Sequence, residues 1–266
     1  MIQAVPPYDP DAPIVVIGIG NTNIALATYQ GNQIKTPLSV PTHDEKAFAE
    51  AYDAHIHAAT KAHPTATIIA SVVPSVLTRI EQHVETRLDK PPLVVGDSIP
   101  LPIDVAVTDP SAVGTDRVCQ AAAAFDRLQT GCTVVSFGTA VTVDLVDDDG
   151  TLLGGAILPG LDMQLRALHD HTAQLPEVPR GCPELPFGRN TIEAIQTGVC
   201  RGIAGSVRNI VEGYATHLNR WPHAVATGGD AEFMQPYCDF IDSFVAHLTL
   251  SGIGYAYRKF LTEVGA

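Results

Sequence analysis

The sequence has few basic residues, and they form no run. Its 16 Lys and Arg stand against 29 Asp and Glu, which gives a formal net charge of −13 at pH 7. A nucleic acid or an anionic membrane surface would be repelled by so much like charge unless the protein carried a basic patch. We therefore expect neither as a partner. An anionic ligand would need main-chain amides, a few well-placed arginines or a bound cation.

Cysteine and long apolar segments are also scarce. The five cysteines are widely spaced and include no CxxC pair, a pattern typical of reduced thiols rather than of a disulfide framework or a zinc site. No apolar run reaches the ~18–20 residues that a membrane-spanning helix requires. The Pro-rich residues 1–13 lack the basic residues and apolar block of a signal peptide. These features predict a cytoplasmic protein.

Two widespread nucleotide-binding motifs are missing, because the chain contains neither a Walker A sequence nor GxGxxG. What the chain does contain is an alternation of strand-like and helix-like segments, which predicts an α/β fold. Strands are expected at 14–17, 24–29, 66–73 and 92–96, in a strand–turn–strand over 133–150, in a strand that ends with the Pro-Gly turn of 154–160, and at the strand-to-loop switch 226–230. Helices are expected at 45–62, 75–88, 117–128, 161–175, from 190 and from 251. At 266 residues the chain is long enough for two domains, which we place at 1–128 and 129–266.

An internal echo supports two related domains. The segment VVIGIGNTNIALATYQG, beginning at Val15, resembles TVVSFGTAVTVDLVDDDG, beginning at Thr133. Gly20 corresponds to Gly138 at a constant offset, and an alternating second strand follows in both segments. Such self-similarity indicates two subdomains that each begin with a β-hairpin, with the two hairpin tips at a shared cleft.

Both hairpin turns are rich in Gly with Asn or Thr, so main-chain amides and hydroxyls can converge on phosphate oxygens. Taken singly, such turns are more often ordinary hairpin chemistry. Two of them at matched positions, together with the Gly-rich 226–230, favour a nucleotide site. In VGTDR, residues 113–117, Asp116 could stabilise the start of a helix, or it could act as a general base beside an anion-binding Arg117.

These motifs together resemble one family, the type III pantothenate kinases. The resemblance covers nearly the whole chain and rests on Gly20–Asn23, Ser71–Pro74, Gly114–Arg117, Phe137–Ala140, Gly154–Gly155, Pro159–Gly160, Asn190–Thr191 and Thr227–Gly229, which occur in the family's order. It implies two ribonuclease-H-like domains of the actin-like ATPase superfold with an interdomain nucleotide cleft, paired as a homodimer. It also implies transfer of the ATP γ-phosphate to pantothenate in coenzyme A biosynthesis, with Mg²⁺ and a monovalent cation, K⁺ or NH₄⁺.

Carried over by residue, the resemblance implies that Asp116 is the catalytic base and that Arg117 orients pantothenate. The remaining residues implied to bind pantothenate are Gly114, Thr115 and Thr191, the last from the partner subunit. The residues implied to bind the nucleotide are Gly18, Ile19, Gly20, Asn21, Thr22, Asn23, Thr139, Thr227, Gly228 and Gly229.

Three positions depart from the family's pattern. Gly18 and Ser136 stand where an Asp is usual, for magnesium-phosphate and for the monovalent cation respectively, and Val107 stands where a pantothenate-contacting Tyr is usual. Each lost carboxylate removes a hard oxygen ligand. Asp144 and the acidic run Asp147–Asp149 could substitute, although the run is expected at the far turn of the second hairpin, in a surface role.

The departures leave three alternatives open. The chain is either a kinase with weakened metal binding, or a catalytically inactive paralogue that acts as a ligand-binding or regulatory protein, or a kinase that acts on a different small hydroxyl compound. The first follows from Asp116 and Arg117, the second from the paired loss at Gly18 and Ser136, and the third from Val107.

Overall fold

The computed structural model describes residues 9, 12–58 and 66–264. Most of the Pro-rich segment 1–13 lies outside the described residues. The described chain divides by contacts into two compact units. Unit 1 takes Met1–Arg127, Gly150–Leu152 and His247–Ala266, and unit 2 takes Leu128–Asp149 and Leu153–Ala246.

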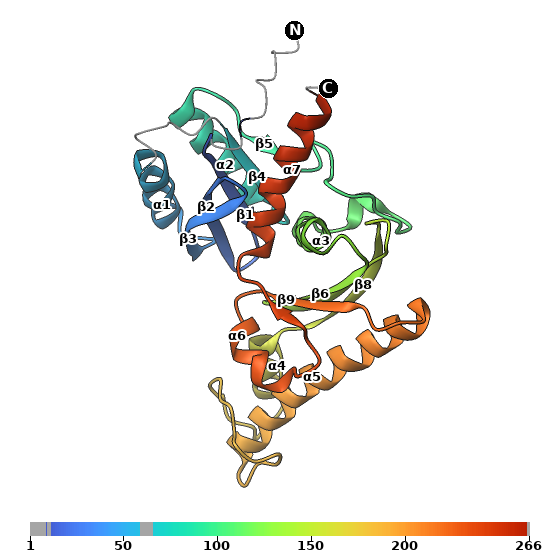
Figure 1. Cartoon of the computed structure of the whole chain (residues 1–266). Coiled ribbons are helices and arrows are strands. Elements are labelled where there is room, and N and C mark those ends of the chain that lie inside the picture. Colours follow the sequence, from blue (N-terminus) through green and yellow to red (C-terminus); the bar gives the residue numbers. More distant parts are fainter. Residues whose placement is uncertain (1–8, 10–11, 59–65, 265–266) are drawn as a thin grey trace. The chain divides into compact units, whose positions relative to one another are not determined.

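A five-stranded sheet in the order β3-β2-β1-β4-β5 forms the centre of unit 1 (Figure 1). Its strands are β1 (Ile14–Ile19), β2 (Asn23–Gln30), β3 (Gln33–Pro41), β4 (Thr67–Ser71) and β5 (Leu93–Val94). β1 pairs antiparallel with β2 and parallel with β4. β1 is apolar throughout because both of its faces are buried, as expected for a central strand with helices on either side.

Helices cover both faces of this sheet. They are α1 (Glu45–Ala58), α2 (Pro74–Leu88), α3 (Thr115–Leu128) and α7 (Leu248–Val264), with a 3-10 turn at Pro110–Ala112. Residues of α1 and α2 share one buried cluster with Val15 and Ile17, whereas α7 shares another with Ile14 and Val16. This alternation along β1 follows the period of two that a strand imposes.

Unit 2 is built on a second five-stranded sheet, in the order β10-β9-β6-β7-β8. Its elements are β6 (Cys132–Phe137), β7 (Ala140–Val146), β8 (Leu152–Pro159), α4 (Leu161–Asp170), α5 (Thr191–Leu218), β9 (His223–Thr227), α6 (Ala231–Met234), a 3-10 turn at Gln235–Tyr237, and β10 (Ser243–Phe244). Apolar side chains of α4 and α5 pack with Val135 and Val143 in one buried cluster.

The two sheets have the same topology, since β3-β2-β1-β4-β5 corresponds strand by strand to β8-β7-β6-β9-β10. β6 also pairs antiparallel with the next strand and parallel with β9. Gly18 and Ser136 each occupy the fifth of six positions in equivalent strands. The predicted α/β class with two related sheets is confirmed, and the sequence echo corresponds to this repeat.

Several boundaries differ from the sequence-based expectations. β3 and β10 were not expected, and α4 ends at Asp170 rather than at Leu175. Thr172 turns the chain there, because its hydroxyl donates to the Leu168 carbonyl and accepts from the Leu175 amide. The part of the first helix expected beyond Ala58 lies outside the described residues.

The last helix belongs by contacts to unit 1, whereas the sequence-based boundary placed all of 129–266 in a second domain. α7 approaches α3 so closely that a Cβ at Gly252 would lie 1.9 Å from the carbonyl oxygen of Cys119. Within the described ranges, no helix combines the length and apolar character needed to cross a membrane.

Candidate active site

The first Gly-rich turn joins β1 to β2 at the carboxyl end of β1. The Gly20 amide donates to the Asn23 carbonyl over 3.0 Å, which closes the turn. Thr42 stabilises the turn, because its hydroxyl donates to the Gly20 carbonyl over 2.7 Å and its amide donates to the Thr22 carbonyl over 3.0 Å. Asn21, Thr22 and Asn23 are exposed. Main-chain and side-chain polar groups are thus presented on a fixed loop.

Gly18 lies just before this turn and faces α7. A Cβ built on it would meet the side chains of Thr249, Leu250 and Ile253 at 3.6 to 3.8 Å, which is ordinary contact. A Cβ atom would therefore fit at this position, so the main chain here does not require glycine. The surroundings are mainly apolar and supply no carboxylate from these three neighbours.

The loop Gly114–Arg117 lies at the same edge of the first sheet. The Thr115 hydroxyl donates to the Ser71 carbonyl over 3.0 Å, and Ser71 is paired with Ile19 of β1 in the sheet. The following amide, that of Val72, donates to the Ile19 carbonyl over 3.1 Å. The carboxyl ends of β1 and β4 thus carry the first turn and this loop side by side, at the edge where open α/β sheets bind ligands.

Asp116 stands in the first turn of α3, with its carboxylate folded back over the helix start. Its Oδ1 accepts from the Arg117 amide over 2.9 Å. Gly114 provides the room, because a Cβ there would lie 2.5 Å from the same oxygen. Burial raises the pKa of Asp116 above its ordinary value, and the amide and charge of Arg117 oppose that rise. The carboxylate therefore has a perturbed pKa at a candidate ligand edge, as expected of a general base.

In unit 2, Ser136 lies in a row of hydroxyl residues across the sheet. It is paired with Thr142 on β7 and with Thr227 on β9. Directly opposed residues share a face, and the neighbours Val135 and Val143 belong to the core on the other face. The Thr142 hydroxyl is buried and has no hydrogen-bond partner among the residues that the structure describes.

The second turn and the Gly-rich loop after β9 are packed together at the carboxyl ends of β6 and β9. Gly228 has a φ of +101°, and a Cβ on it would lie 2.1 Å from the Phe137 carbonyl oxygen. The Asp230 amide donates to the same carbonyl over 3.0 Å. The loop after β8 joins them, since the Gly160 amide donates to the Thr139 carbonyl over 3.1 Å. Thr139 and Thr227–Gly229 are thereby brought to one edge of the second sheet.

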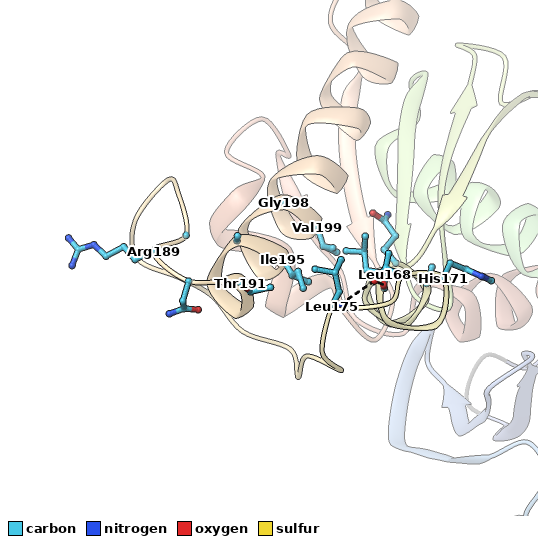
Figure 2. A pocket seen from close by; sticks show the side chains of 14 residues that line it. Leu168, His171, Leu175, Arg189, Thr191, Ile195, Gly198 and Val199 are labelled. Atoms are coloured by element: carbon cyan, nitrogen blue, oxygen red, sulfur yellow. Dashed lines mark hydrogen bonds between the residues drawn. The ribbon is translucent and has the colours of Figure 1, made fainter.

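Thr191 lies elsewhere in unit 2, at the first residue of α5. Asn190 and Glu193 cap this helix reciprocally: the Asn190 side chain accepts from the Glu193 amide over 2.9 Å, and the Glu193 carboxylate accepts from the Arg189 amide over 2.8 Å. Thr191 lines a hollow of about 920 Å³ between α4 and α5. Figure 2 shows Leu168, Leu175 and Ile195 gathered at this hollow, whereas Arg189 points away from it.

The described residues do not fit a metal centre held by the protein. No group of three or more His, Cys, Asp or Glu in the described chain is arranged to hold a metal ion. Gly18 offers no ligand, and Ser136 offers a neutral hydroxyl. Asp144, on the same face of β7 as Thr142, is buried. Of the acidic run, Asp148 is engaged structurally, since it accepts from the Gly131 amide over 2.8 Å and binds Arg220.

One charged residue of this region, Arg180, was not predicted from the sequence. Arg180 lies between α4 and α5 and binds Asp162 and Asp230, each of which follows one of the Gly-rich loops described above. Its partners are 18 and 50 residues away in the chain, so no local motif could have identified it.

Comparison with known proteins identifies a family over most of the chain. The sequence profile of the type III pantothenate kinase family matches residues 14–213. A type III pantothenate kinase from Ruegeria pomeroyi is 36% identical over 251 residues, covering 92% of this chain and 96% of the relative. One from Anaeromyxobacter sp. (strain Fw109-5) is 34% identical over 251 residues, covering 92% and 99%.

Solved structures share the fold at low sequence identity. A Campylobacter jejuni protein named for the Baf family of transcriptional activators is 18% identical with a TM-score of 0.59, covering 91% of this chain and 96% of that one. Component A of (R)-2-hydroxyglutaryl-CoA dehydratase from Acidaminococcus fermentans is 13% identical with a TM-score of 0.56, covering 96% and 100%. The family profile and the relatives, rather than these structures, decide the family: the chain belongs to the type III pantothenate kinases.

Proposed function

We propose that this protein transfers the γ-phosphate of ATP to the primary hydroxyl of pantothenate, forming 4′-phosphopantothenate for coenzyme A biosynthesis. The substrate is the one named for its relatives. The observation that carries the proposal is the position of Asp116, a partly buried carboxylate with a raised pKa, next to the exposed turn at the end of β1. We place the reaction in the cytoplasm, in keeping with the free thiol state of all five cysteines.

In this proposal, Asp116 accepts the proton of the pantothenate hydroxyl. The hydroxyl oxygen then forms a bond to the γ-phosphorus, the bond from that phosphorus to the β–γ bridging oxygen breaks, and ADP leaves. Arg117 orients pantothenate with Gly114 and Thr115, and the Gly18–Asn23 segment binds phosphate oxygens through main-chain amides. Thr139 contributes a hydroxyl to the phosphates, and Thr227–Gly229 contacts the nucleoside.

The chain supplies few ligands for the cations that the reaction uses. ATP is the phosphoryl donor, and Mg²⁺ enters as the MgATP substrate complex, since Gly18 supplies no carboxylate to hold it. The monovalent cation expected from the family, K⁺ or NH₄⁺, has at Ser136 only the neutral hydroxyls of that sheet row. We derive no step through a protein-held metal. Positioning by amides and proton removal by Asp116 carry the chemistry that this chain itself supplies.

We further propose a homodimer in which Thr191 contacts the pantothenate of the partner subunit. Thr191 lies on the rim of the apolar hollow between α4 and α5 (Figure 2). Large apolar side chains are exposed on the elements around it, with Ile192 45%, Met163 48% and Phe187 59% exposed. Apolar surface of this kind favours burial against a second copy of the chain.

The catalytic proposal is tested by measuring ATP-dependent phosphorylation of pantothenate by the purified protein, with mass spectrometry of the product. The matched control is Asp116→Asn, which keeps the side-chain shape and the oxygen that accepts from the Arg117 amide. We expect turnover by the wild type and a loss of at least about a hundredfold in the variant. Equal product formation by both proteins would contradict the assignment of Asp116.

A second candidate function, a ligand-binding protein without catalysis, is favoured by the missing carboxylates at Gly18 and Ser136. It predicts ATP binding in calorimetry without pantothenate phosphorylation. The double variant Gly18→Asp with Ser136→Asp restores both carboxylates, and a Cβ at Gly18 meets its neighbours only at 3.6 Å or more. Activity that arises only in this double variant would support the binding protein, whereas activity in the wild type would exclude it. Assaying other small hydroxyl compounds in parallel tests the acceptor, for which Val107 is the motivating departure.

A further inference from the structure

A single guanidinium group bridges two carboxylates in unit 2. Nε and Nη2 of Arg180 donate to the two oxygens of Asp162 over 2.6 and 2.5 Å, and Nη1 donates to Oδ1 of Asp230 over 2.6 Å. The pair with Asp162 is bidentate, the geometry in which an arginine fixes a carboxylate in orientation as well as in position. Arg180 itself comes from the segment between α4 and α5, which forms neither helix nor strand at this point.

The two carboxylates belong to two separate loops. Asp162 is the second residue of α4 and follows the Gly160 loop at the end of β8. Asp230 follows Gly228 and Gly229 at the end of β9 and is only 12% exposed at its side chain. Arg180 therefore connects segments that are far apart in sequence.

Both loops are packed on the turn after β6. A Cβ on Gly160 would lie 2.1 Å from the Gly138 carbonyl oxygen, and one on Gly228 would lie 2.1 Å from that of Phe137. With such close main-chain packing, a shift of either loop must move the turn or break the contact. The bridge between Asp162 and Asp230 therefore fixes the two loops on either side of the Thr139 turn.

We propose that Arg180 is a positioning residue for ATP, which holds the Gly160 and Gly228–Asp230 loops against the Thr139 turn and neutralises two carboxylates beside the nucleotide. This inference rests on the proposed function, because that function assigns Thr139 and Thr227–Gly229 to ATP. Without the guanidinium, Asp162 and Asp230 would lose their hydrogen-bonded cation at loops that must accept an anionic ligand. Loss of Arg180 should therefore weaken the binding of ATP specifically.

The ionic character of the bridge agrees with this assignment. Hydrogen bonding to Arg180 lowers the pKa of Asp162 below its ordinary value. The Asp162 carboxylate is thus held in its charged form, and Asp230 is paired with the same guanidinium over 2.6 Å. A lysine could keep the positive charge but could not reproduce two parallel hydrogen bonds to Asp162 together with the bond to Asp230.

The test compares Arg180→Gln, Arg180→Lys and the control Arg208→Gln by steady-state kinetics with ATP and pantothenate varied in turn. Arg208 is a suitable control because it is also a half-exposed arginine of unit 2, which pairs with one carboxylate, that of Asp239 over 3.4 Å, and lies 5.2 Å from the centre of the Phe240 ring. We expect Arg180→Gln to raise KM for ATP about tenfold, the size of one lost charged hydrogen bond. KM for pantothenate should stay within about twofold of the wild-type value. For ATP, the KM of Arg180→Lys should lie between those of the wild type and Arg180→Gln, and the KM of Arg208→Gln should equal that of the wild type.

Two outcomes would overturn the inference. One is an unchanged KM for ATP in Arg180→Gln. The other is an equal rise in KM for both substrates with a lower Tm, since that pattern indicates a merely structural role. Calorimetry with ATP alone separates this inference from the proposed function. If the wild type binds ATP without phosphorylating pantothenate, the proposed function fails, and weaker binding by Arg180→Gln would still support the positioning role.

Discussion

At the scale of single residues, Asp116 meets two opposing demands. A general base must be close to its substrate and partly shielded from water, which raises its pKa and makes its charged form less stable. Here burial raises the pKa, while the amide and charge of Arg117 limit the rise. The residue is thus kept at a cost to the stability of the folded protein near neutral pH.

This cost predicts that Asp116→Asn lowers activity but raises stability. A folded-state pKa above the unfolded value contributes stability that is present below the unfolded pKa and lost as pH rises through the folded pKa. The variant lacks this titration, so its Tm should exceed that of the wild type near neutral pH, and the difference should shrink in acid. Scanning calorimetry across this range measures it. If the variant is less stable than the wild type at neutral pH, the charged Asp116 carboxylate stabilises the folded protein, and the prediction is wrong.

Gly114 controls where that carboxylate can lie. A Cβ there would come within 2.5 Å of the Asp116 Oδ1, so Gly114→Ala should displace the base and reduce kcat at least about tenfold. The matched control is Gly202→Ala in α5, where a Cβ meets nothing within 4 Å and where alanine is expected to favour the helix. Steady-state kinetics of the two variants measure the effect. Equal kcat values would show that the Asp116 carboxylate can shift without loss of activity.

The site could be predicted from sequence where its residues are neighbours in the chain. Gly20–Asn23 and Gly114–Arg117 are local motifs, and the structure places them at one edge of a sheet. Arg180 could not be predicted, because its function depends on two acids that only the folded loops bring to it. The position of Gly18 was identified from the family resemblance, but the room around it depends on α7, more than 200 residues further along the chain.

At the scale of elements, the same limit applies to β3 and α7. β3 (Gln33–Pro41) is almost entirely exposed and contains two prolines, and proline within a run weakens a strand prediction even though Ile34, Leu38 and Val40 alternate with other residues. It forms because β2 offers a free edge to pair with. α7 was expected as a helix, but only its packing against Ile14 and Val16 shows that it completes unit 1.

The contact between α7 and α3 gives a prediction for stability. Gly252→Ala would place a Cβ 1.9 Å from the Cys119 carbonyl oxygen, so the two helices must separate. We expect a loss of about 1–3 kcal/mol in the free energy of unfolding, as for overpacked cores. Gly213→Ala in α5, with nothing within 4 Å of its Cβ, should be neutral or stabilising. Urea denaturation of both variants distinguishes local packing from a general effect of alanine in helices.

At the scale of the whole molecule, one topology occurs twice, and each copy presents Gly-rich loops at the carboxyl ends of its parallel strands. A chain with a net charge of −13 gains from such loops, because main-chain amides bind an anion without added basic residues. Two arginines lie near these loops in defined positions: Arg117 follows the proposed base Asp116, and Arg180 pairs with Asp162 and Asp230. Charge is therefore placed locally in a molecule that is acidic overall.

The proposed homodimer provides the prediction at this scale. Ile192→Glu puts a charge beside the hollow between α4 and α5, where a second copy would have to bury it, so we expect a dimer of the wild type to dissociate. Its dissociation constant should rise about a hundredfold or more, the scale of a disrupted interface centre. Trp221→Glu is the matched control, because Trp221 and Ile192 are both 45% exposed while Trp221 lies beyond the far end of α5. Sedimentation velocity of the three proteins measures the effect. If both variants remain dimeric, the interface lies on another surface, and Thr191 then has no partner active site to reach.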